Sequence, residues 1–284
     1  MSSISVVMPT YRDSAHAITT AARLSRQLGP QDELLIVDNG SGGEHLKACE
    51  AYAGQHSGVA IKVLVCGTRG SYAARNLGAS QARGDILAFT DAGCVPSEDW
   101  LETIRRHFEA GSSDRVAGPI VMTYTNSPPS VVELVDARTH LHQDWYVAHG
   151  WAATANTAVR RAVFQIVGGF NQTLQSGGDY EFGIRAHAHG YRIDWCPAMV
   201  VEHGARNTVR DLMKKRRRIR LGQAQLASLA EFSALLERAA QAGPIDRPAV
   251  ARRAYPAVGT TRWLLVRLAC RLLYLYERRL APAK

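Results

Sequence analysis

The stretch Val6-Val-Met-Pro-Thr-Tyr-Arg12 sets the pattern from which the fold follows. An apolar run over residues 4–8 stops at a proline and gives way to polar residues, as a buried strand does where it leaves a sheet. The same pattern returns where residues 33–37 end in Asp38 and where residues 86–89 end in Thr90-Asp91. Apolar strands that alternate with helix-spaced segments predict an α/β protein with a mostly parallel sheet. The expected helices cover residues 15–28, 43–53, 71–83 and 97–109, and one more strand covers 60–65.

The second half of the chain is less regular. Pro128-Pro129 precedes a predicted helix over residues 131–142, and Ser176-Gly-Gly178 leads into another over 179–189. We also expect a helix over 160–167 and short strands at 191–195 and 198–202. In the first half, Ser97 is the expected N-cap of its helix.

The positive charge belongs to the C-terminal quarter. Residues 1–205 contain 16 Lys+Arg against 20 Asp+Glu, whereas residues 206–284 contain 18 against 5. A basic tail on a near-neutral body indicates an anionic partner surface, either lipid or nucleic acid. Nothing beside the run Lys214-Lys-Arg-Arg-Arg-Ile-Arg220 resembles a nucleic-acid-binding module, so we expect no nucleic acid partner.

Several classes are disfavoured by missing patterns. No G-x-G-x-x-G follows the first strand and no G-x-x-x-x-G-K-[ST] occurs, which argues against a dinucleotide-binding protein and a Walker-type ATPase. The five cysteines show no C-x-x-C spacing, so neither a disulfide scaffold nor a zinc site is indicated. Without a signal-peptide pattern or a stretch of about 18 apolar residues, we expect a cytoplasmic protein.

Acidic residues stand at two strand ends. Asp38 and Asp91 follow apolar runs, at the edge of a parallel sheet where ligands bind. Carboxylates there accept hydrogen bonds from a nucleoside or bind a divalent metal. The alternative for each is a turn or capping aspartate, which two such positions in register make less attractive.

Residues 4–222 contain a series of short blocks whose order and spacing resemble those of a family 2 glycosyltransferase. The blocks are Val6-Val-Met-Pro-Thr-Tyr-Arg12, Ile36-Val-Asp-Asn-Gly-Ser41, Ala74-Arg-Asn-Leu-Gly78, Ala82-Arg-Gly-Asp-Ile86, Phe89-Thr-Asp-Ala-Gly-Cys-Val-Pro96, Asn156, Arg160-Arg161, Gly168-Gly-Phe170, and Gly178-Asp-Tyr-Glu-Phe182 followed by Arg185. The resemblance implies a GT-A fold and inverting transfer of a sugar from a nucleotide-diphosphate donor to a hydroxyl.

The resemblance also implies a division of the chain. Residues 1–205 would form the catalytic domain, with a nucleotide-sugar half at 1–97 and an acceptor half at 98–205. Residues 206–284 would form a basic, helical extension. The implied donor-binding residues are Pro9, Thr10, Arg12, Asp38, Arg75 and Asp91, with Arg75 offering its planar fork to the diphosphate.

The sequence departs from the family at the metal. Asp91 matches the first member of the D-x-D motif, but Gly93 stands where the second aspartate is usual. We expect Asp91 and His203 to hold Mg²⁺ or Mn²⁺ more weakly, with phosphates and waters completing the shell. Cations that replace the metal, or a weakened enzyme, are the alternatives.

Asp179 is the expected general base. Inverting transfer needs one carboxylate to take the proton of the acceptor hydroxyl, and Asp179 opens a helix after two glycines. A helix N-terminus favours its ionised form. The alternative is a capping aspartate without a chemical role.

The C-terminal segment has an amphipathic pattern. At about 100° per residue, Arg267, Arg271 and Arg278 fall on one narrow face and apolar residues cover the rest. This suits an in-plane helix on an anionic membrane surface, peripheral at the inner face. It equally suits a helix that packs on the catalytic domain or in a dimer, and the oligomeric state stays open.

We therefore expect a sugar transferase of surface polysaccharide, glycolipid or glycoconjugate synthesis, with a glycan or lipid-linked acceptor. One rival is a non-catalytic sugar-nucleotide-binding scaffold, motivated by Gly93. The other is a nucleotidyltransferase. Such an enzyme is expected to have a basic, glycine-rich loop after its first strand, and the segment Met8-Pro-Thr-Tyr11 is not such a loop.

Overall fold

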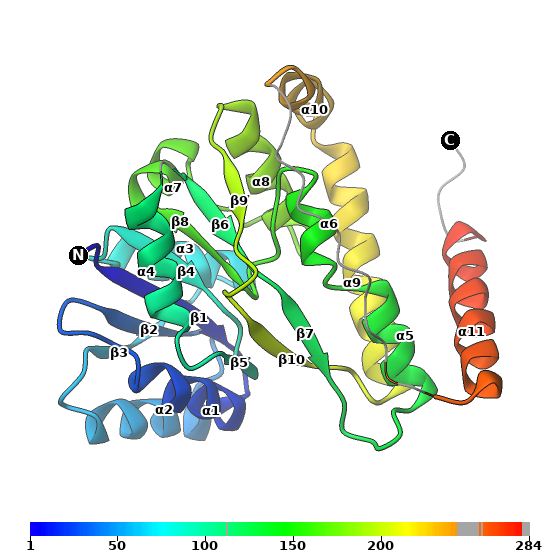
Figure 1. Ribbon diagram of the computed structural model, residues 1–284, viewed down its shortest axis with the longest axis horizontal. Helices are drawn as coiled ribbons and strands as arrows, with labels where there is room; N and C mark the ends of the chain where they lie inside the picture. Colours follow the sequence, from blue (N-terminus) through cyan, green and yellow to red (C-terminus); the bar gives the residue numbers. More distant parts are fainter. Residues whose placement is uncertain (112, 243–255, 257, 280–284) are drawn as a thin grey trace.

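The protein is described by a computed structural model that covers residues 1–111, 113–242, 256 and 258–279 (Figure 1). Its first half alternates strand and helix as the sequence predicts. In chain order the elements are β1 (Ile4–Thr10), α1 (Ser14–Ser25), β2 (Glu33–Asp38), α2 (Gly43–Gln55), β3 (Ile61–Val65), α3 (Ser71–Gln81), β4 (Ile86–Phe89), β5 (Cys94–Pro96) and α4 (Trp100–Ala110).

The second half continues the sheet and adds the helical extension. Its elements are β6 (Arg115–Ala117), β7 (Ile120–Thr123), α5 (Val131–Thr139), α6 (Gln143–Val147), β8 (Thr157–Arg160), α7 (Arg161–Val167), α8 (Gly178–Ala188), β9 (Ile193–Trp195), β10 (Val201–Gly204), α9 (Val209–Ser228), α10 (Phe232–Gln241) and α11 (Thr260–Arg279).

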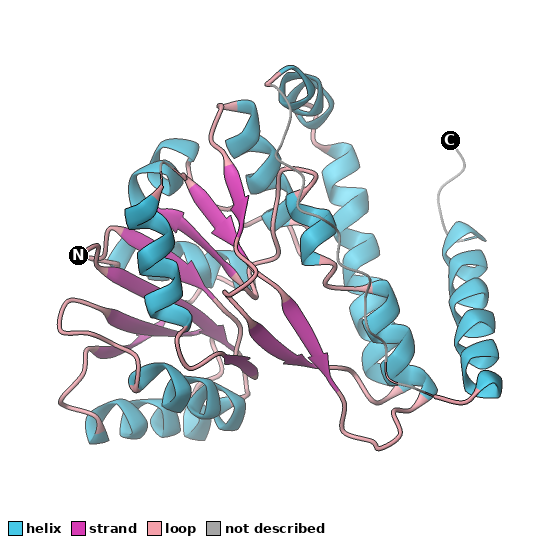
Figure 2. Ribbon diagram, in the orientation of Figure 1, coloured by secondary structure: helices cyan, strands magenta, loops and turns pink. Residues whose placement is uncertain are grey.

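The main sheet has seven strands in the order β3-β2-β1-β4-β8-β6-β9. Only β8 runs antiparallel to its neighbours, so the expected mostly parallel sheet is confirmed. Residues of β1 alternate between two buried layers: Val6 and Met8 pack with α1, α2 and α4, whereas Val7 packs with α3, α7 and α8. Helices therefore cover both faces of the sheet (Figure 2).

A second, three-stranded sheet lies beside the strand ends of the first. Its order is β5-β10-β7, and β10 brings His203 opposite Cys94 of β5. Because Cys94 follows the Asp91–Gly93 turn directly, this small sheet places His203 next to the segment that carries Asp91.

The second half differs from expectation in its boundaries. The predicted helix over 131–142 ends at Thr139, where His140 adopts an extended backbone, and α6 follows as a separate helix. The strand predicted at 198–202 begins later, at Val201, because residues 196–200 turn through local hydrogen bonds. Ser97 is not the N-cap of α4, since that helix begins at Trp100 after Asp99.

The C-terminal helices pack on the catalytic-sized body. α9 and α11 both contact α5, and α11 lies on the outside of the molecule (Figure 1). Val266 of α11 is buried with Leu134, Val135 and Leu212 in a separate apolar cluster. Of the helices in the described ranges, none combines the length and apolar character needed to cross a membrane.

Candidate active site

A single large pocket brings the two halves of the chain together. Its volume is about 1730 Å³, which exceeds the roughly 300–1,000 Å³ of most ligand pockets. The lining residues come from the ends of β1 and β4, the start of α3, α6, the start of α8, β10 and the extension helices α9 and α10. The pocket is therefore large enough for more than one substrate.

The strand ends form one wall of this pocket. Pro9, Thr10 and Asp91 line it together with Arg75 of α3. Arg75 is 4% exposed, and its Nη2 donates to Oδ1 of Asp91. The Nε atom of Arg75 is buried and has no hydrogen-bond partner among the described residues. A buried guanidinium donor without a partner is costly unless an acceptor arrives, so this wall suits an anionic ligand.

Two expected donor residues do not line the pocket. Asp38 is 1% exposed, and its Oδ2 accepts from the Ser41 N–H, which agrees with the alternative turn interpretation, while its role in holding the nucleoside stays a prediction. Arg12 is exposed, and its guanidinium lies 5.2 Å from the centre of the Tyr11 ring. Asn39, which follows Asp38 in the chain, lines the pocket in its place.

Asp179 lies in the same pocket as Arg75 and Asp91, at the start of α8. Its Oδ1 accepts from the Tyr72 hydroxyl at 3.1 Å and from the Tyr180 N–H at 3.0 Å. Both donors contact Oδ1, and among the described residues only the amide of Asp179 itself adds a further hydrogen bond to this carboxylate. Burial raises the pKa of Asp179, although the charge of Arg75 and the Tyr72 hydrogen bond oppose this. The direction of this pKa shift is thus opposite to the helix effect expected from the sequence.

The expected Mg²⁺ or Mn²⁺ site has two candidate protein ligands in the pocket. Asp91 and His203 both line the pocket, and no cluster of three or more His, Cys, Asp or Glu suited to a metal exists in the described part of the chain. Gly93 has φ of +87°, a left-handed backbone in which an aspartate would be strained. The residues fit a Mg²⁺ or Mn²⁺ ion only if a ligand such as a diphosphate supplies most of its oxygen donors.

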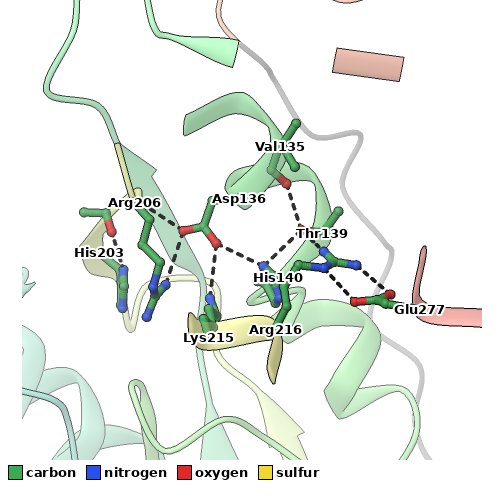
Figure 3. A network of polar contacts seen from close by, with 10 residues as sticks. Val135, Asp136, Thr139, His140, His203, Arg206, Lys215, Arg216 and Glu277 are labelled. Atoms are coloured by element: carbon green, nitrogen blue, oxygen red, sulfur yellow. Dashed lines mark hydrogen bonds and ion pairs between the residues drawn. The ribbon is translucent and has the colours of Figure 1, made fainter. Parts of the chain in front are cut away.

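A second part of the pocket lining, called here the cationic wall, contains Arg206, Lys215 and Arg216, whose polar contacts are shown in Figure 3. Asp136 of α5 is fully buried, and it pairs with Arg206, Lys215 and His140. Burial by itself would raise the pKa of Asp136, but the His140 hydrogen bond and the charges of Lys215 and Arg206 hold it well below its usual range. On α9, Arg216 forms a two-pronged ion pair with Glu277 of α11.

Sequence reasoning misses three features of this site. Asn39 joins two pocket loops, because its amide donates to the Thr68 carbonyl and accepts from the Gly70 N–H. Tyr72 holds the proposed base, and its only signal in the sequence is its place at the start of a predicted helix. The run 214–220 suggests a solvated or membrane face, whereas Lys215 is 9% exposed and lines the pocket.

Comparison with known proteins assigns this architecture. The model of the family described as glycosyl transferase family 2 matches residues 5–167. Glycosyltransferase AglE of Haloferax volcanii is 31% identical over 233 residues, which cover 81% of this chain and 76% of AglE. The chain belongs to glycosyl transferase family 2. It is a glycosyltransferase, as the resemblance in its sequence implied.

A longer relative and two solved structures are also similar. Pre-mycofactocin glycosyltransferase of Mycobacterium tuberculosis is 26% identical over 222 residues, 75% of this chain but 45% of that protein. S. aureus TarS 1-349, solved with UDP-GlcNAc, superposes with a TM-score of 0.59 at 19% identity over 84% of this chain and 71% of its own. Mannosyltransferase PcManGT of Pyrobaculum calidifontis, solved with GDP-Man and Mn²⁺, superposes with a TM-score of 0.59 at 18% identity. The match covers 95% of this chain and 80% of PcManGT. The expected GT-A fold is confirmed. The family match ends before Asp179 and His203, whose roles stay predictions.

Proposed function

We propose that this family 2 glycosyltransferase moves a sugar from a nucleotide-diphosphate donor to a hydroxyl, with inversion at the anomeric carbon. The observation that carries the proposal is Asp179, a carboxylate whose Oδ2 accepts from no other residue described, in the same pocket as Arg75 and Asp91. The bound UDP-GlcNAc and GDP-Man of the two structural neighbours support a donor of this class.

The proposed step uses Asp179 as the base and Arg75 at the leaving group. Oδ2 of Asp179 takes the proton of the acceptor hydroxyl while that oxygen attacks the anomeric carbon. The bond from this carbon to the diphosphate oxygen breaks on the opposite face, and its electron pair leaves with the diphosphate. Arg75 is suited to this leaving group because its buried guanidinium still has a donor to offer. The raised pKa of Asp179 strengthens it as a base.

A divalent ion is proposed at Asp91 and His203. When bound, such an ion supplies positive charge to the departing diphosphate. Asp91 would have to share its carboxylate with Arg75, which contacts Oδ1. Burial lowers the pKa of His203, so its neutral, ligating form prevails at neutral pH.

For the acceptor we propose a glycan or a lipid-linked sugar of surface polysaccharide, glycolipid or glycoconjugate synthesis, reached from the cytoplasmic face of a membrane. The support lies in residues 206–284. Leu264, Leu268, Leu272 and Leu275 of α11 are each 46–59% exposed, on the side away from Val266. Arg267 and Arg271 are exposed beside this stripe, and the charge of Arg278 lies outside the described side chains. Such a face suits contact with anionic headgroups.

The deciding experiment is a transfer and hydrolysis assay over a panel of UDP- and GDP-sugars, with and without Mn²⁺. We expect turnover with one donor, and a loss of activity of at least 100-fold for Asp179→Asn, in line with removal of a general base. Asp144→Asn is the matched control, because Asp144 is buried but does not line the pocket.

The rivals give different results in the same assay. Nucleotide binding by the wild type without turnover of any donor would favour the scaffold. Release of pyrophosphate from a nucleoside triphosphate and a sugar phosphate would favour the nucleotidyltransferase. An inverted linkage in the product, read by the anomeric coupling in a proton NMR spectrum, separates the inverting from the retaining course.

A further inference from the structure

The cationic wall holds more positive charge than its own acids balance. Four basic side chains of this wall line the pocket, and among the described residues the acids that form ion pairs with them are Asp136 and Glu277. The four are Arg206, Lys215, Arg216 and Arg218. A surplus of positive charge on the wall of a concave pocket attracts an anion.

Three basic side chains of this wall are largely buried in the fold and are not freely solvated. The side chains of Lys215 and Arg216 are 8% and 13% exposed, and that of Arg206 is 26% exposed. Burial, followed by the charge of Arg206, lowers the pKa of Lys215 to about 7, against the opposing effect of Asp136. An ammonium kept in so positive a setting gains from any further negative charge. These buried and half-buried cations therefore suit an anion of high charge density.

The wall is also separate from the part of the pocket that suits the donor. Arg75 and Asp91 belong to α3 and the end of β4, whereas the cationic residues belong to α9 and the loop that precedes it. His203 of β10 lines the same pocket as both groups. Because the volume of about 1730 Å³ exceeds that of most single-ligand sites, a donor leaves this wall accessible to a second molecule.

We propose that the wall of Arg206, Lys215, Arg216 and Arg218 binds a phosphate or diphosphate group carried by the acceptor. This inference rests on the proposed function, because it specifies the second substrate of the same pocket. Guanidinium and ammonium groups together are the side chains that bind phosphate oxygens most strongly. The phosphate would hold the acceptor by a charged end while its hydroxyl reaches Asp179. The same chemistry comes from a lipid phosphate or from a phosphate within a glycan.

Two probes distinguish these sources: dodecyl phosphate and glycerol phosphate. Each is titrated by calorimetry into the full chain, in the presence of saturating UDP or GDP, whichever binds, so that the donor site is filled. Arg218→Gln is the test variant, because Arg218 lines the pocket and is exposed, so its replacement is expected to leave the fold intact. Arg217→Gln is the matched control, since Arg217 is exposed on the same helix but does not line the pocket. Lys215→Gln is the second test variant and keeps a polar group toward Asp136.

We expect at least one probe to bind, with a Kd raised 10-fold or more by Arg218→Gln and by Lys215→Gln and unchanged by Arg217→Gln. Preference for dodecyl phosphate assigns a lipid source, and equal binding assigns recognition of the phosphate alone. Binding of neither probe by the wild type overturns the inference. A 10-fold loss of nucleotide affinity in the test variants also overturns it, because the wall would then serve the donor. Phosphate binding that persists in a chain without transferase turnover would instead count against the proposed function.

Discussion

At the scale of single residues, the proposed chemistry depends on Asp179 and on its hydrogen bond with Tyr72. The Tyr72 hydroxyl donates to Oδ1 of Asp179 across two helices, α3 and α8, that are distant in sequence. This hydrogen bond favours the ionised carboxylate, whereas burial favours the neutral acid. The balance between the two sets the pH above which the proposed base works.

Tyr72→Phe is expected to move that balance. Without the hydroxyl, the pKa of Asp179 rises further, so the acid limb of kcat/KM against pH shifts to higher pH, by about one unit for one hydrogen bond to a charged group. The rate on the alkaline plateau is retained. Tyr52→Phe is the control, because the hydroxyl of Tyr52 contacts Ser25 and not Asp179. An acid limb that stays in place in Tyr72→Phe would contradict a positioning role for this hydroxyl.

Asp91 and His203 support a prediction about the metal. If these two residues are the protein donors, as proposed, the other ligands of about six around Mg²⁺ or Mn²⁺ must come from elsewhere. We therefore expect Mn²⁺ to bind at least 10-fold more tightly when UDP or GDP is present. Calorimetric titration with and without nucleotide measures this, and Asp91→Asn should remove the difference. Equal affinity in both titrations would show that the diphosphate does not complete the shell.

At the scale of elements, α9 fixes the turn that presents Asp179. Gly222 of α9 approaches Ser176 so closely that a Cβ atom there would lie 2.2 Å from the Ser176 carbonyl oxygen. Leu226, one helical turn further on, lies against Gly177. The extension helix is thus packed on the Ser176–Gly178 turn, and it forms part of the pocket instead of a separate tail.

Gly222→Ala is expected to displace α9 from this turn. The clash is with backbone, which cannot move aside, so we expect a loss of about 1–3 kcal/mol of stability. Because the turn presents Asp179, we also expect the turnover rate to fall at least 10-fold. Gly54→Ala in α2 is the control, because its Cβ would meet nothing within 4 Å. Thermal unfolding and steady-state kinetics measure both effects, and a Gly222→Ala enzyme as stable and as active as the control would show that the close approach is unimportant.

At the scale of the whole molecule, α11 has one side packed on the body of the protein and another side exposed to solvent. Its inner side is anchored by Val266 and by the pair of Glu277 with Arg216, and Arg262 donates to the Pro129 carbonyl. Its outer side exposes the leucine stripe. The two arrangements left open by the sequence, domain packing and a membrane-facing surface, are therefore compatible, because they use different sides of one helix.

The double change Leu268→Glu and Leu272→Glu is expected to abolish binding to anionic vesicles. Each leucine contributes about 1.5–3 kcal/mol when fully buried in an apolar phase, so we expect co-sedimentation with phosphatidylglycerol vesicles to fall by at least 10-fold. Ile166→Glu is the control, because Ile166 is 65% exposed on α7, outside the extension. If the double variant sediments with vesicles like the wild type, the stripe has another purpose.

The order of strands and helices was determined by the sequence, because apolar runs that end in Pro9, Asp38 and Asp91 are local signals of buried parallel strands. The family resemblance followed from the same blocks. The tertiary structure alone decided which polar groups meet: Tyr72 with Asp179, Arg75 with Asp91, and Asp136 with Lys215, pairs separated by 16 to 107 positions. It also placed part of the basic run 214–220 in the wall of the pocket, and it paired the Asp38 carboxylate with the Ser41 N–H. Periodicity reports how a segment is buried, whereas contacts between distant side chains depend on how the segments pack together.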